Sequence, residues 1–317
     1  MTIRTITKFA CFVISLLFCE TCTNVSFGGS DHAQIGPHNA GFKKAEIIAR
    51  ISSKEINESS GLAVSKCQQD LIWTHNDSGD GPFIYAINSN GESLGTFRLP
   101  NVNNVDWEDI ATIKTNSGEC LLYIGEIGDN ERKRDIHAIY RIKEPIVADE
   151  VSVSSRKDPV ITSAAEILRF SYSDGRHNSE ALMVDPLGGD IYVVTKEFAG
   201  PASVFRIAPK FAPDEVQTAP KIARISLPAT PNGLVTGGDI SPDGKHIVLC
   251  DYFAGYELLL SPTANDLSSI WDQKPEAFDL GPREIGEAVA FGQDAETLYA
   301  TTERLNAPLI RVLRENK

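Results

Sequence analysis

Five segments of this chain begin alike, each with a polar residue or a glycine followed by a short apolar strand. The leading positions are Ser60, Glu108, Glu180, Gly238 and Glu287. A second apolar strand follows each segment, and these second strands end near Asp77, Glu126, Glu197, Asp251 and Glu303. An internal repeat of about 50 residues or more is typical of propellers and arrays, so the repeat constrains the fold more than any other feature.

The strand pattern predicts how such a ring would close. The first unit contains four strand candidates, at 61–65, 71–75, 83–88 and 94–99, separated by turns rich in Gly, Asn and Asp. The fifth unit lacks a fourth strand, whereas a spare strand, 45–51, precedes the first unit. We therefore predict an all-β fold, a five-bladed β-propeller closed by an N-terminal strand, because closure removes exposed sheet edges. A long insertion at 143–165 and a short helical turn at 265–271 are also expected.

The N-terminus resembles a secretory signal. Arg4 and Lys8 precede an apolar stretch at 9–18 that is too short to span a bilayer, and no other segment is long enough to do so. We expect a signal peptide at 1–28, a linker at 29–43 and a single propeller domain at 44–317. The predicted location is exported (periplasmic, extracellular or on the outer surface). Cys19 and Cys22 leave a lipoprotein anchor as an alternative.

The net charge of the chain indicates which classes of partner it can bind, and its cysteines indicate a possible disulfide. The 317 residues carry a formal net charge of −13, which disfavours nucleic acid and anionic membranes and suits cations. No feature indicates an obligate oligomer, so a monomer is expected. Three cysteines lie beyond the signal, namely Cys67, Cys120 and Cys250. Either all three are buried thiols, or Cys67 and Cys120 form a disulfide between neighbouring units.

The leading positions predict a metal site. In a propeller they would converge on one axis, where three carboxylates are costly to bury without a cation or a proton. Oxygen donors without His or Cys suit Ca²⁺. The predicted metal ligands are Ser60, Glu108, Glu180 and Glu287, with Asp239, or alternatively Thr236 or a water molecule, substituting for the missing side chain of Gly238. The alternative is a solvated acidic mouth without a metal ion.

The second set of acids and the nearby basic residues supply candidates for chemistry. Glu126, Glu197 and Glu303 each end an apolar strand and are the predicted catalytic residues that activate water. Lys196, Arg304, Arg132 and Trp107 are the predicted substrate-binding residues. The alternatives are turn formation and solvation for the charged residues and packing between blades for Trp107. His75 and His177 are further candidates for a general base, or are structural.

Two resemblances follow from these motifs. Residues 104–111, 125–130, 179–182, 195–197 and 238–244 resemble a family of secreted bacterial propeller proteins over nearly all of the mature chain. The series Ser60, Glu108, Glu180, Gly238, Glu287 is similar to the axial Ca²⁺ ligands of the calcium-activated nucleotidases of the apyrase type, which are five-bladed propellers with the order Ser, Glu, Glu, Ser, Glu. The chain departs from that order at Gly238. This resemblance implies a Ca²⁺ cofactor. It does not select a substrate, because phytase-like and lactonase-like propellers also hold axial Ca²⁺.

These observations lead to a functional hypothesis with one alternative. The chain is expected to be an exported Ca²⁺-binding propeller that hydrolyses phosphate esters or anhydrides, or esters, and so takes a small-molecule ligand. The alternative is a non-catalytic propeller that holds a structural Ca²⁺ and binds a glycan or a protein.

Overall fold

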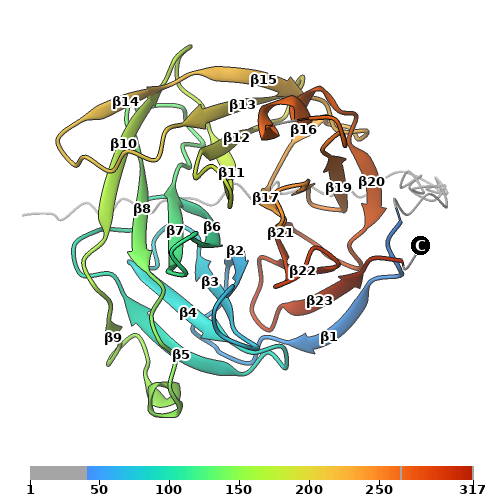
Figure 1. The fold of residues 1–317 in the computed structure, drawn as a ribbon. Helices are drawn as coiled ribbons and strands as arrows, with labels where there is room; N and C mark the ends of the chain where they lie inside the picture. The colour runs from blue at the N-terminus through green and yellow to red at the C-terminus, as the bar shows by residue number, and fades with distance from the viewer. Residues whose placement is uncertain (1–40, 265, 316–317) are drawn as a thin grey trace, which may run out of the picture. The chain divides into compact units, whose positions relative to one another are not determined.

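The computed structural model describes residues 41–264 and 266–315, which form five β-sheets arranged around a central axis (Figure 1). The predicted five-bladed propeller is therefore confirmed. The predicted signal peptide and nearly all of the linker lie outside the described residues. None of the helices in the described residues has the length and apolar content needed to cross a membrane.

The blades follow one another along the chain. The first contains β2 (Ser59–Val64), β3 (Ile72–Asn76), β4 (Phe83–Ile87) and β5 (Ser93–Arg98), and the second contains β6 (Trp107–Lys114), β7 (Cys120–Glu126), β8 (His137–Lys143) and β10 (Glu166–Tyr172). The third contains β11 (Ser179–Val184), β12 (Ile191–Glu197), β13 (Ala202–Ile207) and β15 (Lys221–Ile225), with β16 (Gly233–Leu234) paired to β12. The fourth contains β17 (Gly237–Ile240), β18 (His246–Cys250), β19 (Ala254–Leu259) and β20 (Glu276–Asp279).

The fifth blade is built from both ends of the described chain. It contains β21 (Gly286–Phe291), β22 (Thr297–Thr302) and β23 (Pro308–Leu313), and its outer strand is β1 (Glu46–Arg50), which pairs antiparallel with β23. The closing strand expected at 45–51 thus forms where the repeat count required it. Figure 1 shows β1 at the rim of the molecule beside β23.

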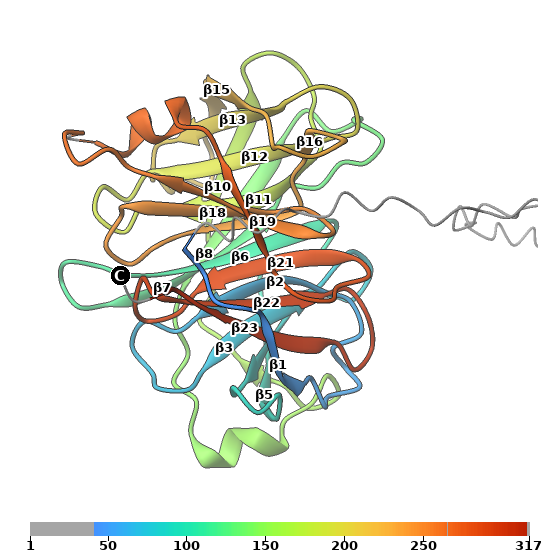
Figure 2. The ribbon, with the colours of Figure 1, turned by 90° about the vertical axis from the view of Figure 1, so that its right-hand side faces the viewer.

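Two outer strands were not anticipated from the repeat. The insertion after β8 contains a short 3₁₀ helix, η1 (Asp149–Val153), and β9 (Val160–Ile161), which adds a parallel strand to β5 of the first blade. β14 (Val216–Ala219) adds a parallel strand to β10 of the second blade. Figure 2 shows the coil of η1 projecting beyond the blades. The expected helical turn forms as η2 (Leu267–Asp272).

The hydrophobic core is divided among the interfaces between blades. Five clusters of buried apolar side chains occur, and each joins strands of two neighbouring blades. Trp73 and Trp107, for example, lie in the cluster between the first and second blades. Each sheet therefore has two apolar faces, and the sheet-on-sheet packing leaves the polar residues to the two ends of the channel.

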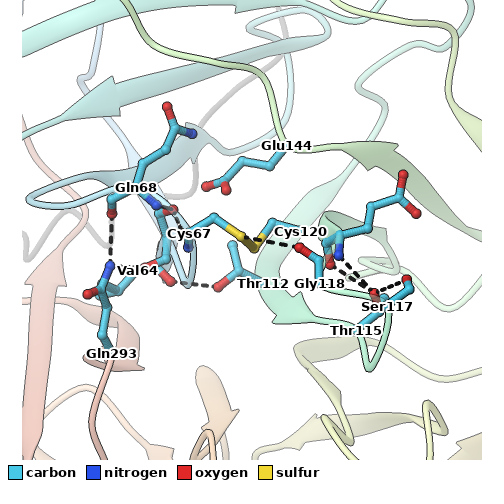
Figure 3. The surroundings of a disulfide bond; sticks show 12 residues. Val64, Cys67, Gln68, Thr112, Thr115, Ser117, Gly118, Cys120, Glu144 and Gln293 are labelled. Atoms are coloured by element: carbon cyan, nitrogen blue, oxygen red, sulfur yellow. Dashed lines mark hydrogen bonds between the residues drawn. A yellow bond between two sulfur atoms is a disulfide. The ribbon is translucent and has the colours of Figure 1, made fainter.

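A disulfide links the first two blades. Cys67 and Cys120 are bonded, with Cα atoms 6.2 Å apart, whereas Cys250 is a buried free thiol. The disulfide alternative is thus confirmed for the first pair, and the free-thiol interpretation holds for Cys250. Figure 3 shows the bond beside Glu144, whose carboxylate accepts a hydrogen bond of 2.7 Å from the indole of Trp73.

We expect the disulfide to stabilise the ring. In protein that begins at residue 29, the Cys67→Ser/Cys120→Ser double variant should lower the thermal midpoint by about 5 °C or more, because the cross-link restricts the unfolded chain. Dithiothreitol should lower the wild-type midpoint similarly and leave the double variant unchanged. Thiol labelling of unfolded wild-type protein should give one site before reduction and three afterwards. Equal labelling in both states would contradict the assignment.

Candidate functional site

β-Bulges set the leading residues apart at one end of the channel. In four inner strands the pairing skips one residue, between Ser59 and Gly61, Trp107 and Asp109, Ser179 and Ala181, and Gly286 and Ala288. The skipped residues are Ser60, Glu108, Glu180 and Glu287. A bulge redirects a side chain and is common beside functional sites. In the fourth blade, the register is continuous from Gly237 to Ile240, so Gly238 lacks both a side chain and a bulge.

One ammonium group lies among these carboxylates. Lys196 Nζ is 3.2 Å from Glu180 Oε1 and 4.0 Å from Glu287 Oε1, and it lies 5.0 Å from the centre of the Tyr252 ring. Burial by itself lowers the pKa of Lys196, but the two carboxylates and Tyr252 outweigh burial and raise it. Lys196 is therefore a permanent cation that neutralises part of one side of the mouth.

A second side of the mouth contains carboxylates without a cation. Oxygen atoms of Asp77, Asp106 and Glu108 all lie within 4.8 Å of one another. Within the described part of the chain, none of the three forms an ion pair. Gly128 makes room for them, because a Cβ there would lie 2.0 Å from Glu108 Oε1 and 2.6 Å from Asp106 Oδ2. Three adjacent carboxylates of this kind require protons or a cation.

The electrostatics agree with that requirement. Burial, followed by the charge of Glu180, raises the pKa of Glu108 well above its usual value, and the two carboxyl groups are close enough to share a hydrogen bond. Burial and the charge of Asp77 raise the pKa of Asp106 and that of Glu303 to about 7. In addition, Glu287 is only 4% exposed and its Oε2 atom has no hydrogen-bond partner among the described residues. We use the term mouth site for the following seven residues, six with a carboxyl group and one with an amine: Asp77, Asp106, Glu108, Glu180, Glu287, Glu303 and Lys196.

Neighbouring residues hold this arrangement in place. Glu126 accepts hydrogen bonds from the backbone N–H groups of Val105 and Asp106, at 2.9 and 3.0 Å, and pairs with Arg134 at 2.8 Å. This network favours a positioning role for Glu126, which orients the loop that carries Asp106. Asn178 donates a hydrogen bond of 2.9 Å to Glu180 Oε1.

Several predicted site residues form their contacts with residues outside the mouth site. Trp107 is fully buried and packs edge-on against His75 between the first two blades. Arg132 pairs at 2.6 Å with Glu197, the last residue of β12, and Arg304 pairs at 2.8 Å with Glu284. The structure brings together Glu108, Glu180, Glu287, Lys196 and Glu303 from the predicted set. Ser60 joins them through its hydroxyl, which donates a hydrogen bond of 3.1 Å to the Glu108 carbonyl.

Asp239 has a different role from the predicted one. Its carboxylate accepts hydrogen bonds from the N–H groups of Ile240, at 2.8 Å, and Phe291, at 2.9 Å, so it links the fourth and fifth blades deeper in the channel. Asp109 does the same for the second and third blades, accepting from Ile110 and Leu182, each at 2.9 Å. The two Asp-Ile pairs at the same phase of two repeats are the sequence signal for these links.

Sequence reasoning omitted three residues from the site. Asp77 and Asp106 complete the cluster with Glu108, and Tyr252 covers Lys196. Asp77 was recognised as the end of a second strand. Asp106, which lies two residues before Glu108, carries no consistent repeat signal, because the equivalent positions of the other repeats are Glu58, Asn178, Thr236 and Ile285.

Comparisons with known proteins show similarity of shape only. No family model matches the chain, and no curated protein matches it. A chain of a nidogen/laminin complex is 14% identical, with 78% of this chain and 72% of that chain covered and a TM-score of 0.44. A gluconolactonase from Xanthomonas campestris is 13% identical (86% and 93% covered, TM-score 0.42). A soluble aldose sugar dehydrogenase from Escherichia coli, in its apo form, is 10% identical (86% and 99% covered, TM-score 0.45). The resemblance to the apyrase-type nucleotidases remains a prediction.

The raised carboxyl pKa values predict how stability depends on pH. An acid with a higher pKa in the folded state binds protons more tightly when folded, so stability falls as pH rises from the unfolded pKa to the folded one. For Glu303 this interval runs from its ordinary value of 4.5 to about 7. In EDTA, the thermal midpoint of the wild-type protein should therefore decrease as the pH rises from 5 to 8. Glu303→Gln should reduce this fall by about 2 °C or more. Glu276→Gln, at an exposed position on β20, should not change it; an equal effect of both variants would contradict the assignment.

Proposed function

We propose that the chain is an exported, Ca²⁺-dependent hydrolase of phosphate esters or anhydrides, or of esters, whose centre is the mouth site. One observation carries this proposal. Six carboxyl groups gather at the mouth, yet Lys196 is the only side-chain cation within 4.0 Å of any of them in the described residues. Such a site is stable when ionised only if a further cation binds.

The residues present fit Ca²⁺ best beside Asp77, Asp106 and Glu108. All of the donors are oxygens, which suit a hard cation rather than zinc or copper. Lys196 already occupies the side of Glu180 and Glu287, so the proposed position is displaced from the axis towards the first two blades. Ser60 and Glu180 border this position. The axial set expected from the sequence is thereby revised without changing the kind of ion.

The remaining residues have roles that follow from their charge. When bound, the ion polarises the scissile group of the substrate. Glu303 removes a proton from the attacking water. Burial and the charge of Asp77 raise its pKa, and a cation beside Asp77 lowers that pKa again and so favours the ionised form that acts as the base. Lys196 offers a fixed positive charge to the oxygen that becomes negative during the reaction. Tyr252 and Glu180 hold the Lys196 side chain in place.

Export is supported by the covalent structure. The Cys67–Cys120 disulfide would be reduced in most cytosols and persists in oxidising compartments. Together with the basic and apolar N-terminal segment, it favours a protein that acts outside the cytoplasm.

A binding propeller with a structural ion is the second candidate. Glu108, Glu180 and Glu287 are each no more than 4% exposed, and such burial is typical of ligands that hold an ion for stability. On this alternative the mouth site binds a glycan or a protein without turnover. The two experiments below distinguish the candidates.

Ca²⁺ should stabilise the folded protein. Adding millimolar Ca²⁺ to protein from residue 29 in chelator-treated buffer should raise the thermal midpoint by about 5 °C or more. Asp106→Asn and Gly128→Ala should abolish most of this rise, the latter because its methyl group would collide with Glu108. Glu166→Gln, on an exposed part of β10, is the matched control and should keep the full rise. If no divalent cation changes the midpoint, both candidates fail.

Turnover should depend on Glu303 and Lys196. With aryl phosphates and aryl esters as substrates and Ca²⁺ present, Glu303→Gln should lower kcat by about 100-fold or more. Lys196→Met should lower kcat/KM by a similar factor. Both variants should still show a rise in midpoint with Ca²⁺. A Ca²⁺ response without any turnover in the wild-type protein would favour the binding propeller.

A further inference from the structure

Exposed apolar side chains surround the mouth site. Among the described residues, six large ones lie on loops at this end of the channel. Five of them lie within two residues of Tyr252 or of a mouth-site residue: Val105 (60% exposed), Phe198 (65%), Phe253 (59%), Ile285 (43%) and Leu305 (53%); the sixth, Ile136 (47%), precedes β8 and is further along the chain from those residues. We call these five residues the apolar rim. Large apolar side chains are normally buried, and a group of them at one place marks a surface that binds something.

Chain connectivity places the apolar rim next to the site. Val105 precedes Asp106, Phe253 follows Tyr252, and each of the others lies two residues from a mouth-site residue: Phe198 from Lys196, Ile285 from Glu287 and Leu305 from Glu303. Consecutive Cα atoms are about 3.8 Å apart, so the Cα atoms of four rim residues lie within about 8 Å of a mouth-site Cα, and that of Phe253 lies about 4 Å from that of Tyr252, whose ring covers Lys196. The rim residues come from five different loops, which approach the axis from different directions.

We propose that the ligand of the mouth site is an amphiphile, namely a phosphate or ester group attached to an alkyl or aryl chain, and that the apolar rim determines this specificity. The inference rests on the proposed function, because it requires the phosphate or ester group of the ligand to bind the proposed Ca²⁺ ion. The carboxylates of the mouth would repel a bare anion, so the anionic group requires Ca²⁺. The five rim side chains are uncharged and suited to the hydrocarbon part, and the neighbouring Arg304 and Glu284 pair with each other at 2.8 Å.

The position of the rim residues distinguishes them from other exposed apolar side chains of the molecule. Leu187, on the loop between β11 and β12, and Leu259, at the end of β19, are 66% and 52% exposed, but they lie at the opposite ends of their strands from the mouth. They match Phe198 and Leu305 in exposure and so serve as controls. If exposed apolar area alone caused binding, substitutions at the rim and at the control positions would weaken binding equally.

The test is titration calorimetry with hexyl phosphate and ethyl phosphate, each in Ca²⁺ and in EDTA. In Ca²⁺, hexyl phosphate should bind at least about tenfold more tightly than ethyl phosphate, since each fully buried methylene contributes about fourfold. Phe198→Ser and Leu305→Ser should remove most of this preference without changing the Kd of ethyl phosphate. Leu187→Ser and Leu259→Ser should keep it. Neither phosphate should bind in EDTA.

The other outcomes separate the two proposals. Equal affinities for the two phosphates in Ca²⁺, or loss of the preference in the control variants, would overturn the rim inference and leave the Ca²⁺ site intact. Rim-dependent binding of hexyl phosphate that persists in EDTA would keep the rim and overturn the role of the cation. Hexylammonium is the opposite-charge probe. If it binds in EDTA through the rim while hexyl phosphate fails in Ca²⁺, the ligand is a cationic amphiphile and both proposals are overturned.

Discussion

The structure depends on blades that have two apolar faces. Neither face can be buried within a single sheet, so each blade must pack against neighbours on both sides, and the five core clusters lie between blades. This requirement is met for all five sheets only when the ring closes. The polar residues are consequently confined to the strand ends and the channel, where the mouth site forms.

Within that frame, the main electrostatic problem is the convergence of like charges on one axis. The bulges at Glu108, Glu180 and Glu287 direct three carboxylates inward, although each is at least 96% buried. The chain offsets part of this cost with Lys196. Lower in the channel, Asp109 and Asp239 are instead satisfied by backbone N–H groups of adjacent blades. Carboxylates deeper in the channel therefore have hydrogen-bond partners and a structural role, whereas the negative charge of the mouth carboxylates is only partly neutralised. This difference is why the mouth, and not the channel interior, is the candidate site.

The sequence predicted most of the fold, because strand repeats and turn residues are local signals. The missing fourth strand of the last unit and the spare strand at 45–51 together predicted the closure. β9 and β14 were missed, since each pairs with a strand of another blade and only tertiary packing determines that pairing. The ring carboxylates were predicted from repeat phase. Asp106 and the contact of Lys196 with Glu180 and Glu287 were not, because loop conformation and side-chain reach determine them.

The closing strand also has a consequence for when the protein can fold. β1 pairs with β23, so Glu46 meets Arg311 across almost the whole length of the described chain. The last blade cannot be completed until the C-terminal strand has been synthesised, and contacts between such distant segments form slowly. A chain whose first strand has no partner until the end remains unclosed during synthesis. That property would be compatible with the proposed export, in which a chain crosses a membrane unfolded and assembles its ring on the other side.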